Sequence, residues 1–320
     1  MASPWVKPER AVTCEPASNE APLSGSRIEA VFLDQLIGAE GARGDRTALT
    51  ALARLRDVMR EDGFDVQRLP RMPAVLPALL QELRNDDAGL PEIAELVRRD
   101  AVLAGEVIRA GNSAYYSRGD NLSNVAHAVR LLGQEGLRDV VPAVLMRPIH
   151  STRPGSLAHA INETMWAHAQ RCAAAGAMLA RGRCNPFEAQ LAGYVGAIGV
   201  NALVRLLVQE GLPVEVLCAA EVRPHLLPIA WHVCWQASSH WAFPATIQQA
   251  VMQHAQRVAS SELARVLAAA DRLAMLQLAQ QSGRVPIDAR CADDSCPALP
   301  MQETLDALHR MFVPENAEAN

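Results

Sequence analysis

Aromatic residues are scarce in this 320-residue sequence, since Phe, Trp and Tyr together make up 4% of it. Half of the residues are nevertheless hydrophobic, so alanine and leucine supply most of the apolar side chains. Sheets favour aromatic and β-branched residues, whereas Ala and Leu are strong helix formers. The composition therefore predicts an all-α protein, and the chain is long enough to bury a large core.

A strong charge of one sign is also missing. The net charge is −5, with acidic and basic residues interspersed, so there is no basic stripe of the kind that nucleic-acid binding requires. No stretch of about 18 apolar residues is free of both charge and proline. Residues 1–20 contain no apolar signal core. We therefore expect a cytoplasmic protein with no nucleic-acid partner and no membrane contact.

Cysteines are present but do not form a metal-binding pattern. The seven cysteines are scattered, which fits a reducing compartment. Cys291 and Cys296 lie five residues apart in a predicted loop, but no two further ligands are evident nearby. A zinc site there is an alternative that the sequence does not favour.

Proline and glycine divide the chain into segments. Residues 1–26 show little apolar periodicity and are predicted to be a disordered or loosely docked lead-in. Pro70 and Pro73 exclude a continuous helix, and another break falls at 148–154. The predicted segments after the lead-in are N-terminal helices (27–68), a helical subdomain (69–154), a second helical subdomain (155–282), and a C-terminal loop with one short helix (283–320).

Apolar residues recur at helical spacing through most of the chain. Ser123 is the expected N-cap of a helix that Gly133 ends, and Pro142 is expected to bend the helix that follows. Short helices are predicted over 27–37 and 301–312, and further helices over 46–61, 156–181, 190–209, 226–240, 245–256 and 261–280.

Four motifs occur in a fixed order in the first subdomain. They are Leu69-Pro-Arg-Met-Pro73, Asp100 followed by Ala101-Val-Leu103, Ala110-Gly-Asn-Ser-Ala-Tyr-Tyr116, and a helix ending in Leu132-Gly133. In this order they resemble the motifs of HDOD domains, which are output domains of bacterial signalling proteins. The resemblance is strong over 69–146 and weaker over 160–275. The positions that carry it are Leu69, Pro70, Pro73, Asp100, Asn112, Ser113, Tyr115, Leu132 and Gly133, with Trp241 and Pro244 further on.

Several of these positions also have a plain structural interpretation, which we favour. Asn112 and Ser113 follow a helical run, where short polar side chains can cap freed backbone groups rather than bind a ligand. Tyr115 is interpreted as a core or interface aromatic rather than a stacking platform.

The second subdomain of HDOD proteins is related to HD hydrolases, so the resemblance implies a multi-helical HD-like bundle. That fold gathers a His, an adjacent His-Asp pair, further His residues and a later Asp around one or two metal ions. Such ions turn bound water into a nucleophile. Here Ala192-Gly-Tyr-Val-Gly-Ala-Ile-Gly199 resembles the segment with the pair, which falls on Gly196 and Ala197. Neither residue has a donor atom.

The other metal-ligand positions are partly kept. Trp166-Ala-His168 resembles the segment with the first His, Val251-Met-Gln-His254 keeps one further His but has Ala255 in place of the next, and Asp271 resembles the last Asp. Arg272 is an available countercharge for Asp271. Another expected His falls on Ala230, although His232 is close. No site is indicated by the spacing of His127, His159, His225, His240 and His309.

The resemblance therefore implies a degenerate site with no catalytic residue, metal or other cofactor. We expect a non-catalytic regulatory module that binds signalling proteins in trans, from two-component or cyclic-dinucleotide pathways, and a small ligand is a further option. A residual metal-dependent phosphohydrolase acting on a nucleotide or cyclic dinucleotide is the alternative. A nucleic-acid-binding regulator is a third, which the acidic balance disfavours.

Overall fold

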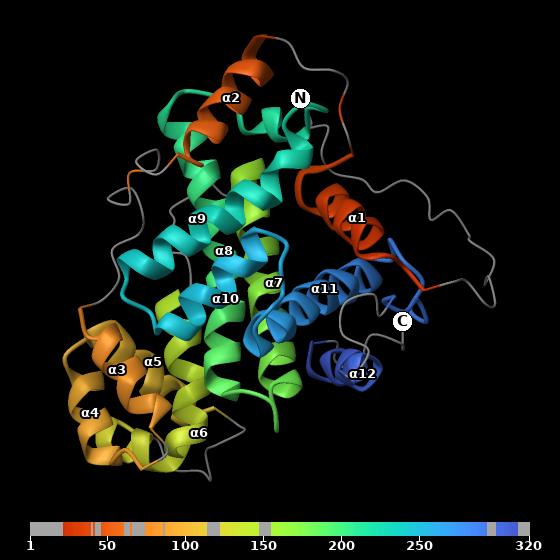
Figure 1. Ribbon diagram of the computed structural model, residues 1–320. Coiled ribbons are helices and arrows are strands. Elements are labelled where there is room, and N and C mark those ends of the chain that lie inside the picture. Colours follow the sequence, from red (N-terminus) through yellow and green to blue (C-terminus); the bar gives the residue numbers. More distant parts are fainter. Residues whose placement is uncertain are drawn as a thin grey trace, which may run out of the picture.

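The computed structural model describes residues 22–39, 41, 46–60, 65, 74–85, 87–113, 122–146, 155–292 and 299–312. These residues form an all-α bundle, which confirms the predicted fold class (Figure 1). The helices are α1 (Gly25–Ile37), α2 (Arg46–Asp57), α3 (Leu76–Arg84), α4 (Leu90–Arg98), α5 (Ala101–Gly111), α6 (Val125–Met146), α7 (Leu157–Leu179), α8 (Pro186–Gln209), α9 (Leu226–His240), α10 (Ala245–Ala255), α11 (Glu262–Gln281) and α12 (Met301–Phe312), with 3-10 turns η2 (Val214–Cys218) and η3 (Arg223–His225).

Two groups of helices are visible in Figure 1. Helices α3 to α5 pack against each other and against α6, and we call α3–α6 the motif half. Helices α7 to α11 form the second group, which we call the HD-like half. In it α7 and α8 form the central pair, α9 covers α8, α11 covers α7, and α10 bridges α9 and α11. The predicted boundary between 154 and 155 stays a prediction.

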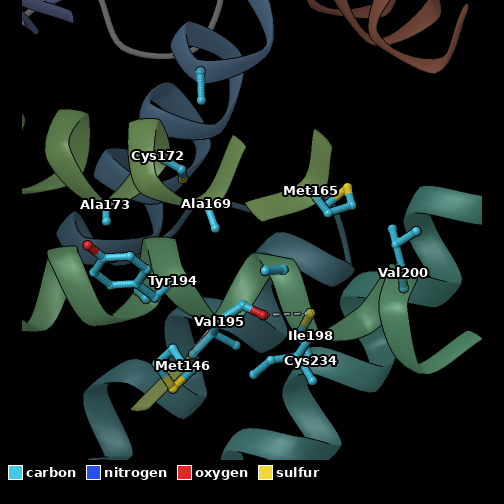
Figure 2. Packing of buried hydrophobic residues seen from close by; sticks show 14 of the residues in the cluster. Met146, Met165, Ala169, Cys172, Ala173, Tyr194, Val195, Ile198, Val200 and Cys234 are labelled. Atoms are coloured by element: carbon cyan, nitrogen blue, oxygen red, sulfur yellow. Dashed lines mark hydrogen bonds between the residues drawn. The ribbon is translucent and has the colours of Figure 1, made fainter. Parts of the chain in front are cut away.

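The central pair is closely packed because small residues face each other. A Cβ added at Gly193 would lie 2.5 Å from the backbone nitrogen of Ala173, so α7 and α8 are in backbone contact there. Figure 2 shows Ala169, Cys172 and Ala173 near Tyr194 and Val195. Helix α8 is also long and apolar enough to cross a membrane, but 83% of its apolar stretch is buried, so packing within the bundle accounts for its composition.

The N-terminal segment differs from the prediction. Residues 1–21 lie outside the described part of the chain, but 22–26 are ordered. Leu23 pairs with the backbone of Arg290 and Ala292 through two hydrogen bonds of 2.8 Å. The side chain of Ser24 caps α1 by accepting a hydrogen bond from the backbone N–H of Arg27. The predicted disordered lead-in is therefore wrong for its last five residues.

Other helix ends differ from their predicted positions. Helix α8 starts four residues earlier than predicted, because Asn185 caps it and Pro186 occupies its first turn. Helix α2 ends at Asp57, before the predicted residue 61. The backbone at the start of α6 is held by Asn124, whose Oδ1 accepts from the N–H of Ala126 at 2.8 Å, so the N-cap assigned to Ser123 is wrong. Gly133 interrupts α6 with φ 63°, as predicted.

Candidate functional site

The positions of the His-Asp pair lie in the middle of α8. Gly196 and Ala197 are both buried there. A Cβ at Gly196 would lie 3.0 Å from Cη2 of Trp231, a residue of α9. The indole therefore stands against the point where a side chain at position 196 would begin, and any larger residue would have to displace it.

Three helices bring His168, Asp271 and His254 together. Nε2 of His168 (α7) lies 3.1 Å from Oδ1 of Asp271 (α11), and Nε2 of His254 (α10) lies 3.2 Å from Oδ2 of the same carboxylate. The carboxylate and the His168 ring are almost fully buried, at 4% and 1% exposure, whereas His254 is only partly buried.

The two contacts differ in geometry. The His254 contact is a hydrogen bond. His168 and Asp271 are equally close, but their atoms are not aligned for hydrogen bonding, and both ring nitrogens of His168 are buried without a hydrogen-bond partner.

The electrostatic balance favours the ionised carboxylate. Burial alone would raise the pKa of Asp271, but the two imidazoles outweigh burial and hold that pKa well below its usual range. Arg272 is not the countercharge that the sequence suggested. Its Nε donates to the backbone oxygen of Ala268 at 3.2 Å, and its side chain lies beside Gly25.

Aromatic rings cover both imidazoles. The ring of Phe32, from α1, lies 5.1 Å from that of His168, and the ring of Trp231 meets His254 edge-on at 4.3 Å between centroids. Between them is a cavity with room for about one water molecule. Only two of its lining residues are charged or titratable, and the full set is Phe32, Met165, His168, Gly196, Val200, Leu227, Ala230, Trp231, Asp271 and Met275.

A metal centre of the HD type does not fit these residues. The sequence motifs put Gly196 and Ala197 at the positions of the His-Asp pair and Ala255 at that of the second His of the later pair, and none of these three side chains has a donor atom. The two remaining imidazoles each contact the carboxylate of Asp271. In the described ranges, no three His, Cys, Asp or Glu side chains are arranged to hold a metal ion. Both ring nitrogens of His168 and Oδ1 of Asp271 are buried without a hydrogen-bond partner, so metal analysis is the direct experimental check.

The remaining candidates near this centre do not contribute donors. Ala230 lines the cavity, and its backbone oxygen lies 2.0 Å from where a Cβ on Gly199 would be, so α8 and α9 are in close contact. His232 is not among the lining residues. Its ring lies 5.3 Å from that of Trp235, and burial lowers its pKa.

In the motif half, two polar positions identified in the sequence form hydrogen bonds with backbone groups at helix ends. The carboxylate of Asp100 caps α5 by accepting from the N–H of Leu103 at 2.9 Å. Asn112 forms two hydrogen bonds with the backbone of Leu122. Its Nδ2 donates to the carbonyl oxygen at 2.9 Å, and its Oδ1 accepts from the N–H at 2.7 Å. Asn112 therefore ties the end of α5 to the chain just before α6.

The other motif positions vary in what they contact. Ser113 is exposed, while Leu132 is buried next to the kink at Gly133. Trp241 follows α9, and Pro244 precedes α10. Leu69, Pro70, Pro73 and Tyr115 lie outside the described residues, so their interpretations stay predictions.

Sequence reasoning missed the two aromatic rings that cover the imidazoles. Phe32 lies in a segment that the HDOD resemblance does not cover. The apolar periodicity of residues 25–37 indicates a buried helix face but not the residue it contacts. Trp231 stands next to Ala230 in the sequence, at a position where a ligand was expected. A bulky aromatic residue beside that position was the one sequence signal that the cavity is partly filled.

Known proteins agree with this architecture. Residues 69–257 match the HDOD domain model, and the chain belongs to the HDOD domain family. Its fold is similar to that of an HDOD domain protein of unknown function from Geobacter sulfurreducens, at 20% identity and a TM-score of 0.51, with 80% of this chain and 88% of that one covered. It is also similar to a provisionally assigned metal-dependent phosphohydrolase from Shewanella amazonensis SB2B, at 20% identity and a TM-score of 0.50, with 86% and 93% covered. No curated protein matches the chain.

Proposed function

We propose that this protein is a non-catalytic regulatory module of bacterial signal transduction, located in the cytoplasm, which acts by binding other proteins. The observation that carries the proposal is the state of the former metal centre. By the motif resemblance the His-Asp pair falls on Gly196 and Ala197, and Trp231 lies 3.0 Å from where a side chain at position 196 would begin. An HD phosphohydrolase needs that pair, because metal-bound water is its nucleophile.

The motif half supports binding rather than chemistry. Its preserved polar residues Asp100 and Asn112 hold helix ends in place. Its outer surface carries Val102 on α5, 70% exposed, and Leu131 on α6, 39% exposed. Exposed apolar residues on a rigid helical surface are suited to contact another protein. We infer that components of two-component or cyclic-dinucleotide pathways are the partners.

The test is affinity capture of the tagged chain from its native host, together with a deletion strain. We expect one or more specific partners and a signalling phenotype. A Val102→Glu variant should lose the partner, because the new charge would be buried at the contact. Val208→Glu is the matched control, since Val208 is 58% exposed at the end of α8, outside the motif half. Absence of any specific partner, together with unchanged behaviour of the deletion strain, contradicts the proposal.

A second candidate function is a residual metal-dependent phosphohydrolase. It is favoured by one observation, the convergence of His168, Asp271 and His254 at a single point. It requires a transition metal in the purified protein and phosphate release from a nucleotide or cyclic dinucleotide, which His168→Ala abolishes. Purified protein without a stoichiometric ion eliminates it.

A further inference from the structure

The carboxylate of Asp271 contacts imidazoles from two other helices, although the remaining positions of the metal centre have lost their donors. We propose that His168, Asp271 and His254 form a metal-independent cross-brace, which joins α7, α11 and α10 and stabilises the HD-like half. The retained ligands would then serve the fold and not a reaction.

Burial makes the partners of this carboxylate essential. A carboxylate that is 4% exposed loses nearly all of its hydration, which costs free energy unless other groups replace the water. His254 forms a hydrogen bond with Oδ2 at 3.2 Å, and Nε2 of His168 lies 3.1 Å from Oδ1, so one imidazole stands at each oxygen. Removing one member of such a buried set leaves the other uncompensated, so each loss should destabilise the fold strongly.

The residues around the cross-brace favour a site without a metal ion. Phe32 lies against the His168 ring, and Trp231 meets His254 in a T-shaped contact, so aromatic side chains flank both imidazoles. The cavity beside His168 and Asp271 has room for about one water molecule. A two-metal centre with its bridging ligand and water has no space there.

The contribution of the cross-brace can be measured as a melting temperature, independently of any partner. Asp271→Asn keeps the shape of the side chain but removes its charge. We expect the melting temperature to fall by roughly 5–10 °C, which is the scale for breaking a buried pair in a chain of this size. The fall should be the same in EDTA and in added Zn²⁺ or Mn²⁺, and the melting temperature of the wild type should not change with EDTA.

Two further variants keep the test decisive if Asp271→Asn does not fold. His254→Gln removes a less buried partner, with a side chain 14% exposed, and should lower the melting temperature clearly. His309→Gln is the matched control, because the Nε2 of His309 bonds a neutral group, Oε1 of Gln280, at 2.9 Å. The cross-brace predicts a larger fall for His254→Gln than for His309→Gln. It also predicts that His254→Gln and Asp271→Asn together cost less than the sum of the two.

Two results would overturn the cross-brace. One is an unchanged melting temperature of Asp271→Asn, or equal shifts for His254→Gln and His309→Gln. The other is stoichiometric metal in the purified protein together with a wild-type melting temperature that EDTA lowers. Such metal without phosphate release would overturn the cross-brace alone. Phosphate release that His168→Ala abolishes would overturn the proposed function.

Discussion

The two halves of this protein use their family motifs in opposite ways. In the motif half, Asp100 and Asn112 keep their polar groups and bond the backbone at helix ends. In the HD-like half, Gly196 and Ala197 have no polar side chain, and the space is closed by packing. The polar motif residues of one half thus bond the backbone, whereas the residues at the motif positions of the His-Asp pair in the other half are small and closely packed. How tightly each half is packed can be compared by making the same substitution, glycine to alanine, in both halves.

The largest expected effect is that of Gly199→Ala in the HD-like half. A Cβ there would lie 2.0 Å from the backbone oxygen of Ala230, so α8 and α9 would have to separate. We expect a loss of about 3 kcal/mol or more in the free energy of unfolding, since a packed core does not yield to added volume. Urea denaturation followed by circular dichroism measures it. An unchanged midpoint would mean that these helices are not in backbone contact.

A smaller loss is expected for Asn112→Ala in the motif half. The change removes two hydrogen bonds to Leu122 and leaves its N–H and carbonyl group to find other partners. We expect a loss of about 1–3 kcal/mol in the free energy of unfolding. Asn112→Asp keeps the acceptor for the Leu122 N–H and should recover part of the loss. Equal values for the two variants would contradict the role of this hydrogen bond.

Gly105→Ala should have the opposite sign from Gly199→Ala. Gly105 lies within α5 of the motif half and is exposed, and a Cβ there would meet nothing within 4 Å. Alanine lowers the backbone entropy of the unfolded chain, so we expect a gain of about 0.5–1 kcal/mol in the free energy of unfolding. The same denaturation assay applies. A loss would show that this exposed face of α5 is covered in solution.

The smallest effect concerns the junction between the halves. Nε2 of Gln190 (α8) donates to Oδ1 of Asp139 (α6) at 2.9 Å, and burial raises the pKa of Asp139. The folded state then binds the proton more tightly than the unfolded state, so the stability contributed by this group falls as the pH rises through its folded pKa. Asp139→Asn should be more stable at neutral pH by only a few tenths of a kcal/mol, since Asp139 keeps an exposed surface and water screens the effect.

A control for Asp139→Asn comes from pH itself. The advantage over the wild type should disappear at about pH 3, where the carboxyl group is protonated in both states. Thermal melts of both proteins at the two pH values provide the measurement. An advantage of Asn that persists at low pH would indicate a change in packing instead of charge.

The helices were largely predictable, because apolar spacing and capping residues are local signals. The prediction located α9 and α12 correctly, but it missed the start of α8, where Asn185 and Pro186 are start signals that it did not use. Ordered motifs also indicated that His168, His254 and Asp271 belong to one centre. What spacing could not give was the cover over that centre, since Phe32 reaches His168 through the packing of α1 against distant helices.

The error at Arg272 has a simple geometric cause. Adjacent residues of an α-helix point about 100° apart, so a neighbour in sequence is a poor candidate for a partner in space. The side chain of Arg272 lies beside Gly25 on α1, while Asp271 faces α7 and α10. Partners of a buried charge on a helix are better sought on the helices that pack against it than one residue along the chain.

Helix α11 carries Asp271, yet it begins five residues after the segment that matches the family model ends at residue 257. A recombinant fragment trimmed to 69–257 would therefore leave both imidazoles without their carboxylate and would uncover the apolar sides of α7 and α10. A fragment that keeps the contacts of His168, Asp271 and His254 extends through Gln281 and includes α1, whose Phe32 covers the His168 ring. For anyone expressing this protein, sequence similarity is a poor guide to where it can be cut.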